Sequence, residues 1–287
     1  REALLLTESL RTFGGVLKDS PVWIMTPDGQ PLREGERLSR IVELGARIIP
    51  YTADSRVMGF ALSDKAAAAA RAERLAEEGS FDAMAWLDND TVILREPSAF
   101  LLGPGIVIGC RPVHHRLIGS LYSQPPSSLW EFVYQREGVS EDNIYPMTTT
   151  IDRQEIRPYY NAGLLIVRPE RRILRAWYKE LARLLRNPES EQVYSRVSRG
   201  ELFFHQVVLS AVILSLVPKE QIVELPFSYN YPLHLHGSCP KDLRPSSWND
   251  LATLRYDSWG NVMGTTWKRS LPAEEPLQSW LAERFAN

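Results

Sequence analysis

Cysteine is scarce in this chain, with only Cys110 and Cys239 among 287 residues. Their wide separation excludes the close-spaced cysteine pairs of structural zinc sites. A single long-range disulfide is compatible with this count, but two reduced thiols are more typical of a cytosolic protein. We therefore expect a cytoplasmic location.

Long hydrophobic runs are also lacking. The longest apolar stretch, residues 207–217, is interrupted by serines and is too short to span a bilayer. The chain does not open with positive charges followed by an apolar stretch, so we expect no signal peptide and no transmembrane segment.

A strong charge of either sign is absent as well. The formal net charge is -2, and 44% hydrophobic with 24% charged residues is typical of a globular protein. Such a balance gives no general attraction to nucleic acid, which we do not expect as a partner. A polyanionic ligand would need a local cation, either a side chain or a metal.

Three common motifs are missing. No Gly-x-x-x-x-Gly-Lys-Ser/Thr segment occurs, which argues against a P-loop kinase. No Gly-x-Ser-x-Gly occurs, which weakens a hydrolase reading. The glycines at 103 and 105 do not open a helix, so they form no dinucleotide-binding loop.

Apolar runs alternate with amphipathic segments over the first two-thirds of the chain. The spacing predicts helices over 3–13, 33–44, 63–78, 169–186, 201–216 and 276–285, and strands over 21–25, 46–51, 83–87, 106–109, 163–167 and 222–225. Residues 120–156 are expected to form a long irregular excursion. This alternation predicts an α/β fold with a mostly parallel sheet flanked by helices.

Asp88-Asn89-Asp90 follows the predicted strand at 83–87 directly. Ligands of such sheets bind beyond the carboxyl ends of the strands. Two carboxylates one residue apart can converge there on a hard divalent cation, which also accepts phosphate oxygens. Asp and Asn are also common in turns that bind no ligand. The position directly after a strand is what favours a metal site here.

Several segments then resemble one family in the right order. Residues 84–93 look like the Asp-x-Asp segment of GT-A nucleotide-diphospho-sugar transferases, in particular the glycogenin and bacterial galactosyltransferase branch. Residues 160–167 resemble the Asn-Ala-Gly strand of that branch, and residues 203–209 its acid-Gln-x-x-Leu segment. Ser9-Leu10-Arg11 and Lys65 also match in type and order. The resemblance extends over about residues 1–240.

The resemblance implies a metal site. Asp88 and Asp90 would hold Mn²⁺ or Mg²⁺, with a third ligand from the loop that contains His234 and His236. His236 is favoured because it precedes Gly237 as in the family loop, and His234 remains open. The two side chains would point the same way only in an extended segment.

It also implies a donor site for a sugar nucleotide, with a UDP-sugar expected. Asn161, Ala162 and Gly163 would line the sugar, since glycine allows close approach and an Asn amide bonds hydroxyls. Further contacts are expected from Asn89, from Lys65 and from Lys241 near the diphosphate. On sequence alone, a solvated charge is the more common role for such a lysine.

Gln206 and His205 would lie near the reacting carbon. In the family an acidic residue usually precedes this Gln, and here it is His205, which does not simply replace a carboxylate. A histidine on a helix face is also often structural. A second departure is that the family's fold opens with a strand, whereas this sequence opens with the helix that would follow it.

We therefore predict a single domain over 1–287, with a nucleotide-binding half at 1–110 and a sugar and acceptor half at 111–287. The predicted activity is metal-dependent sugar transfer to an unknown glycan or other acceptor, with retention of configuration. Two alternatives are a sugar-phosphate nucleotidyltransferase and a GT-A-like binding protein without activity.

Overall fold

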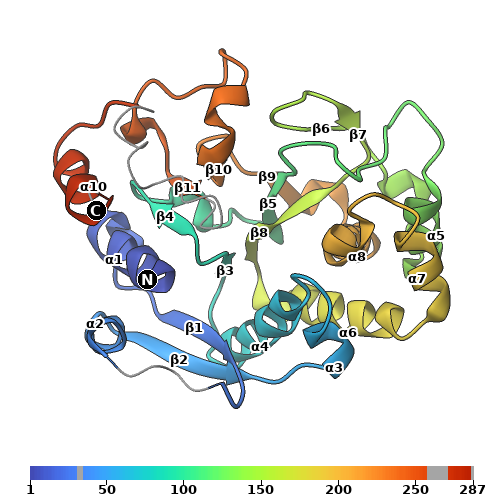
Figure 1. Cartoon of the computed structure of the whole chain (residues 1–287), viewed down its shortest axis with the longest axis horizontal. Coiled ribbons are helices and arrows are strands. Elements are labelled where there is room, and N and C mark those ends of the chain that lie inside the picture. Colours follow the sequence, from blue (N-terminus) through green and yellow to red (C-terminus); the bar gives the residue numbers. More distant parts are fainter. Residues whose placement is uncertain (31–34, 257–270, 286–287) are drawn as a thin grey trace.

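The computed structural model describes residues 1–30, 35–256 and 271–285 (Figure 1). The α-helices are α1 (Glu2–Phe13), α2 (Glu36–Glu43), α3 (Ser55–Met58), α4 (Asp64–Glu78), α5 (Ser128–Glu137), α6 (Ile173–Leu185), α7 (Pro188–Tyr194), α8 (Gly200–Leu216) and α10 (Leu277–Phe285). The strands are β1 (Val22–Pro27), β2 (Ala46–Tyr51), β3 (Met84–Leu87), β4 (Thr91–Ile93), β5 (Ile108–Pro112), β6 (Met147–Thr148), β7 (Glu155–Ile156), β8 (Tyr160–Val167), β9 (Ile222–Glu224), β10 (Tyr231–Pro232) and β11 (Thr253–Arg255).

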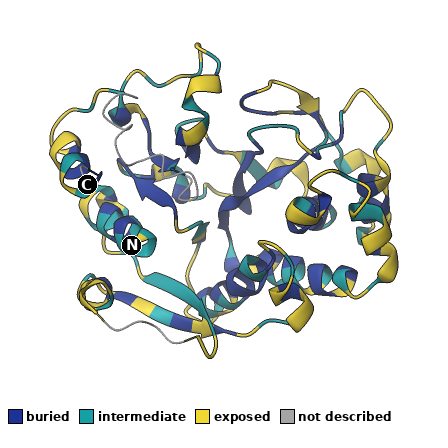
Figure 2. Ribbon diagram, viewed as in Figure 1, coloured by how far each residue is buried: buried dark blue, intermediate teal, exposed yellow. Residues whose placement is uncertain are grey.

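The central sheet has the strand order β3-β8-β5-β9. Strand β8 is antiparallel to both β3 and β5, and β5 is parallel to β9. The predicted α/β class is confirmed, but the pairing is mixed rather than mostly parallel. The chain enters β8 from a long excursion instead of a crossover helix, so this strand runs against its neighbours. All eight residues of β8 are buried, which suits a strand in the middle of a sheet (Figure 2).

Strands β1 and β2 form a separate parallel pair, with Val22 opposite Ala46. Helix α4 packs on this pair and on β3. Its buried alanines let it also lie close against α6. Ser63 precedes α4 as predicted, but its side chain accepts no hydrogen bond from the first turn, so it does not act as the expected N-cap.

A third sheet joins distant parts of the chain. Strand β11 is antiparallel to β4, with Arg255 opposite Thr91, and parallel to β10. The sequence did not predict β11 or β4 as strands. Their pairing brings residues near 254 beside the segment that follows Asp90.

Helix α1 packs against strand β4 of this sheet. The Ser9 hydroxyl accepts a 3.0 Å hydrogen bond from the backbone N–H of Ile93. Phe13 packs edge-on against Trp280 of α10, with ring centroids 5.5 Å apart, and the two helices lie side by side in Figure 1. Arg11 donates to the carbonyl of Leu44 at 2.8 Å. Ser9 and Arg11 of the resembled segment therefore act as structural links.

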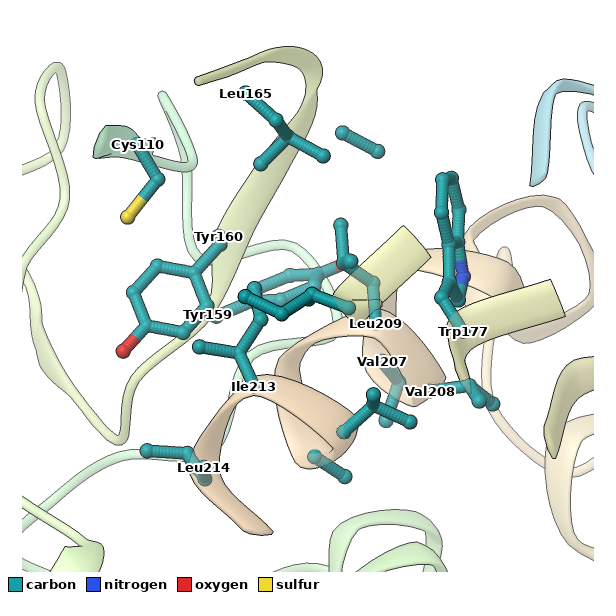
Figure 3. Packing of buried hydrophobic residues seen from close by; sticks show 14 of the residues in the cluster. Cys110, Tyr159, Tyr160, Leu165, Trp177, Val207, Val208, Leu209, Ile213 and Leu214 are labelled. Atoms are coloured by element: carbon teal, nitrogen blue, oxygen red, sulfur yellow. The ribbon is translucent and has the colours of Figure 1, made fainter. Parts of the chain in front are cut away.

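The main core surrounds α8 (Figure 3). Nearly every side of this helix is buried, as its continuous apolar sequence predicts. Leu209 and Ile213 pack here with Tyr160 of β8 and Trp177 of α6. Each fully buried side chain of this size contributes about 1.5–3 kcal/mol of transfer free energy.

The expectation of an irregular excursion over 120–156 is wrong in part, because α5 and the β6–β7 hairpin lie within it. Leu129 and Val133 occupy one face of α5 and are fully buried. Trp130 is buried beside them and donates to the carbonyl of Ile118 at 2.7 Å. The serines and prolines around this segment obscured its helical spacing.

Other boundaries also differ. The predicted helix over 33–44 begins at Glu36, and residues 31–34 lie outside the described part of the chain. Asn187 ends the predicted helix over 169–186, but its side chain then caps α7 by accepting from the N–H of Glu189 at 3.0 Å. In the described ranges, no helix is long and apolar enough to cross a bilayer.

Candidate active site

The site is built on the turn between β3 and β4. The backbone N–H of Asp88 donates to the carbonyl of Gly163 at 2.9 Å, which continues the β3–β8 ladder by one residue. The N–H of Thr91 then donates to the carbonyl of Asp88 at 3.1 Å and closes the turn. Asn89, at the tip, is exposed. The Asp-x-Asp segment is therefore both a turn and a convergent pair of carboxylates.

Arg255 joins the two carboxylates. Its Nε donates to Asp90 Oδ1 at 3.0 Å, and its Nη2 donates to Asp90 Oδ2 at 3.1 Å. The same Nη2 lies 3.2 Å from Asp88 Oδ2. This two-pronged geometry is the strong form of a guanidinium–carboxylate pair. The β4–β11 register, which sets Arg255 opposite Thr91, directs the guanidinium toward Asp90.

Lys65 neutralises the other carboxylate from the first turn of α4. Its Nζ lies 2.7 Å from Asp88 Oδ1 and 3.0 Å from Oδ2. Burial by itself raises the pKa of Asp88, but the charges of Lys65 and Arg255 outweigh it and hold the pKa below its ordinary value. Asp88 is thus ionised at neutral pH, and Lys65 is a member of the site rather than a solvated charge.

The cationic side chains of this cluster are more exposed to solvent than the two carboxylates. The side chains of Arg255 and Lys65 are 25% and 18% exposed, whereas those of Asp88 and Asp90 are 13% and 6% exposed. A ligand approaching from solvent therefore meets positive groups before it meets the carboxylates.

Gly163 forms the floor of the cluster. A Cβ at this position would lie 2.8 Å from Asp88 Oδ2 and 2.9 Å from Arg255 Nη1. The side chain of Asn161 turns back and accepts a 2.8 Å hydrogen bond from the N–H of Gly163. Asn161 and Ala162 are both buried in β8.

Helix α8 supports this strand through Gln206, whose Oε1 accepts a 3.0 Å hydrogen bond from the N–H of Ala162. His205 is buried beside it, and its Nδ1 has no hydrogen-bond partner among the described residues. Burial and the Lys65 charge lower the pKa of His205 to about 3, although the Asp88 charge opposes them. The imidazole is therefore neutral at working pH and lies within the field of the Lys65–Asp88 pair.

The favoured loop histidine, His236, has another partner. Residues 233–238 form a 3₁₀-helix instead of the extended segment that would align His234 with His236. His236 Nδ1 is hydrogen-bonded to the Tyr231 hydroxyl at 2.7 Å. In the described part of the chain, no group of three or more His, Cys, Asp or Glu side chains is placed to hold a metal. Lys241 is exposed beyond this loop.

Two residues of the site were not predicted. Arg255 lies in a short segment with no recognisable motif, so only the β4–β11 pairing reveals it. His114 follows β5, and both its ring nitrogens are buried without a hydrogen-bond partner among the described residues. Burial, followed by the positive charges of Arg255 and Arg111, lowers the pKa of His114 well below its ordinary value. Its place after a strand end is a signal that the sequence did contain.

A pocket of about 600 Å³ opens near the carboxyl end of β5. Its lining residues are Arg111, Thr148, Thr149, Thr150, Arg153, Glu224, Leu225, Pro226, Phe227 and Leu243. Arg111 is buried at its base, where it donates to Glu224 Oε1 at 2.9 Å and to Thr150 Oγ1 at 3.1 Å. Asp88 and Asp90 do not line this pocket.

Residues 1–217 match the model of the Rhodobacterales glycosyltransferase domain. The chain belongs to this glycosyltransferase family. The match includes Asp88, Asp90, Gly163 and Gln206 but ends before Arg255. No curated protein matches the chain.

Three solved glycosyltransferases are similar in structure to this chain, and one of them, at a TM-score of 0.50, shows the shared fold. An active-site mutant of LgtC is 15% identical, with a TM-score of 0.50, 100% of this chain and 92% of that chain covered. The galactosyltransferase LgtC with donor and acceptor sugar analogues is 14% identical, with a TM-score of 0.46 and coverage of 99% and 89%. Mouse xyloside xylosyltransferase 1 is 12% identical, with a TM-score of 0.44 and coverage of 89% and 91%. The GT-A class expected from the sequence is confirmed.

Proposed function

We propose that this glycosyltransferase transfers a sugar from a nucleotide-diphospho-sugar, with a UDP-sugar as the expected donor, to an acceptor hydroxyl. The observation that supports this most is the convergence of Asp88 and Asp90 at the end of β3, beside Gly163 and with two cations on them. Strand ends of α/β sheets are where such ligands bind.

In this reaction the bond between the sugar C1 and the diphosphate oxygen breaks, and its electron pair leaves with the diphosphate. The acceptor oxygen forms the new bond to C1 and loses its proton. Positive groups fixed near the leaving diphosphate stabilise the charge that develops there. Retention of configuration at C1 stays a prediction from the family resemblance.

The roles of the β8 and α8 residues follow from their placement. Asn161, Ala162 and Gly163 are proposed to line the sugar because the family resemblance implies it; in this structure all three are buried, and Asp88 and Arg255 occupy the space beside Gly163. Gln206 holds this strand in position through the N–H of Ala162. His205 is a neutral polar group here, because a pKa of about 3 makes it a weak base.

Mn²⁺ or Mg²⁺ at Asp88 and Asp90 stays a prediction of the sequence. As arranged, these carboxylates do not fit a divalent cation, since Arg255 and Lys65 contact all four of their oxygens. His236 is hydrogen-bonded to Tyr231 instead, and His234 is exposed. An ion would have to displace Arg255 to bind.

Two further proposals concern the division of the chain into two halves and its location in the cell. Residues 1–110 would supply Lys65, Asp88 and Asp90, with Asn89 exposed for donor contact. Residues 111–287 would supply the sugar and acceptor half, with Lys241 as a contact near the diphosphate. A cytoplasmic location accords with Cys110 and Cys239, which are both free and buried.

The test is calorimetric titration of UDP and of a UDP-sugar panel into the wild type, Asp88→Asn and the control Glu189→Gln. Glu189 pairs with Arg136 on the exposed surface, so its loss leaves the site intact. We expect at least about tenfold weaker binding for Asp88→Asn, because Lys65 and Arg255 lose the carboxylate that positions them for the diphosphate, and this loss outweighs the added positive charge of the cluster. Equal affinities of all three proteins, or release of pyrophosphate from a nucleoside triphosphate and sugar phosphate, would overturn the proposal.

A further inference from the structure

The space between the two aspartates of the turn is already filled by a positive group. The guanidinium of Arg255 bonds both oxygens of Asp90 and lies 3.2 Å from Asp88 Oδ2. Lys65 takes both oxygens of Asp88. Every carboxylate oxygen of the pair therefore has a cationic partner within the protein.

We infer that Arg255 takes the place of a divalent cation between Asp88 and Asp90, and that the donor diphosphate binds to Arg255 and Lys65 without metal. The identity of the anion rests on the proposed function. In this arrangement the aspartates position the two cations, and the cations face the ligand.

The charges support this assignment. Two carboxylates and two cations sum to zero, so the cluster does not repel a diphosphate as a bare Asp pair would. A divalent ion would have to break the two-pronged Arg255–Asp90 pair before it reached Asp90.

The surroundings favour a guanidinium over an ion. Gly163 leaves room for the Arg255 head group, because a Cβ there would approach Nη1 to 2.9 Å. The register of β11 on β4 fixes the backbone of Arg255 opposite Thr91. No His, Cys, Asp or Glu in the described ranges completes a three-ligand site with the Asp pair. A hard divalent ion usually takes several oxygen ligands, such as the carboxylates of Asp and Glu.

A lysine at position 255 could not bridge Asp88 and Asp90 as Arg255 does. Arginine presents a planar fork of donors that spans two carboxylates, whereas a lysine ammonium is a point charge on a flexible stem. Arg255→Lys is therefore expected to keep the charge and lose the bridge.

The experiment measures Mn²⁺ binding to the full chain by electron paramagnetic resonance, where bound Mn²⁺ loses the signal of the free ion. We expect no binding to the wild type up to the millimolar range in the absence of UDP, which would itself bind Mn²⁺. Arg255→Ala should gain Mn²⁺ affinity by at least about tenfold, because it frees two converging carboxylates for a hard cation. The control Arg136→Ala removes an exposed Arg–Glu pair and should behave as the wild type.

Calorimetry with UDP gives the second readout. Wild-type affinity should be the same within about twofold in chelator and in Mn²⁺, while Arg255→Ala should lose binding in chelator and regain it in Mn²⁺. If Arg255→Ala does not fold, Arg255→Gln keeps a polar side chain and removes the charge. Mn²⁺ binding by the wild type without UDP, or no gain in either variant, would overturn the inference.

The two proposals fail separately. If UDP and UDP-sugars bind to no variant under any condition, the proposed function fails, and the Mn²⁺ titration still decides the role of Arg255. If UDP binds to the wild type only with Mn²⁺, the function stands and the assignment of Arg255 is wrong.

Discussion

Gly163 and Asp88 approach so closely that a methyl group on Gly163 would lie 2.8 Å from Asp88 Oδ2. Gly163 and the Asp88 carboxylate therefore pack directly against each other. Because Gly163 also accepts a backbone hydrogen bond from Asp88, any displacement of β8 displaces the turn that carries the Asp pair.

The first prediction is that Gly163→Ala lowers transferase activity and destabilises the fold by about 1–3 kcal/mol, because overpacking pushes Asp88 and Arg255 apart. Gly103→Ala is a matched control, since no atom lies within 4 Å of the Cβ it would add. Donor affinity and urea denaturation would be measured on both. Wild-type affinity in Gly163→Ala would show that the Asp88–Arg255 spacing is not needed.

The second prediction concerns His205. Burial is the main reason that its pKa falls to about 3, so the folded protein resists protonation that the unfolded chain accepts near pH 6.5. The unfolded state binds more protons between these values, and the contribution of His205 to stability therefore falls as pH decreases from about 6.5 toward 3. His205→Gln should reduce this acid sensitivity.

Nuclear magnetic resonance of the imidazole checks the charge state directly. The ring signals of His205 should stay constant from about pH 5 to 8 in the folded protein and should titrate near 6.5 in urea. A folded-state titration near neutral pH would mean that His205 is a candidate acid or base after all.

The third prediction concerns Glu137 at the end of α5. Burial and the nearby Glu180 charge raise the pKa of Glu137 to about 7, while its 2.7 Å contact with Arg183 opposes them. The folded state then binds the extra proton between about pH 4.5 and 7, so stability falls as pH rises through this window. The slope would be at most about 1.4 kcal/mol per pH unit.

Glu137→Gln keeps the shape of the side chain and removes the titration. Denaturation curves of the two proteins should diverge between pH 4.5 and 7, with the variant becoming the more stable one as pH rises. Parallel curves across this range would contradict the raised pKa of Glu137.

Local patterns predicted much of the scaffold and part of the site. The alternation of apolar and amphipathic segments placed α1, β1, β2, α4 and β3, because each has a clean helical or strand period. The position of Asp88 after β3 followed from the same pattern. The family resemblance placed Gly163 against the donor sugar, but its contact with Asp88 was not predicted, since nothing local to either segment shows that β8 lies beside β3.

The rest depended on pairings between distant segments. Arg255 sits in a three-residue strand whose partner is β4, and such a short segment has no period of its own. The expected third ligand from His236 was inferred for an extended loop, but residues 233–238 coil into a 3₁₀-helix. Side-chain direction in a loop is set by packing that a single sequence does not display.

The Arg255–Asp90 pair spans 165 positions of the chain. During synthesis Lys65 and both aspartates emerge long before Arg255, so Asp90 remains without its cationic partner until β11 has been made and has docked on β4. A chain stopped before residue 253 would keep the Lys65–Asp88 pair and leave Asp90 without its partner. The site is therefore complete only after the C-terminal third has been translated and β11 has docked on β4.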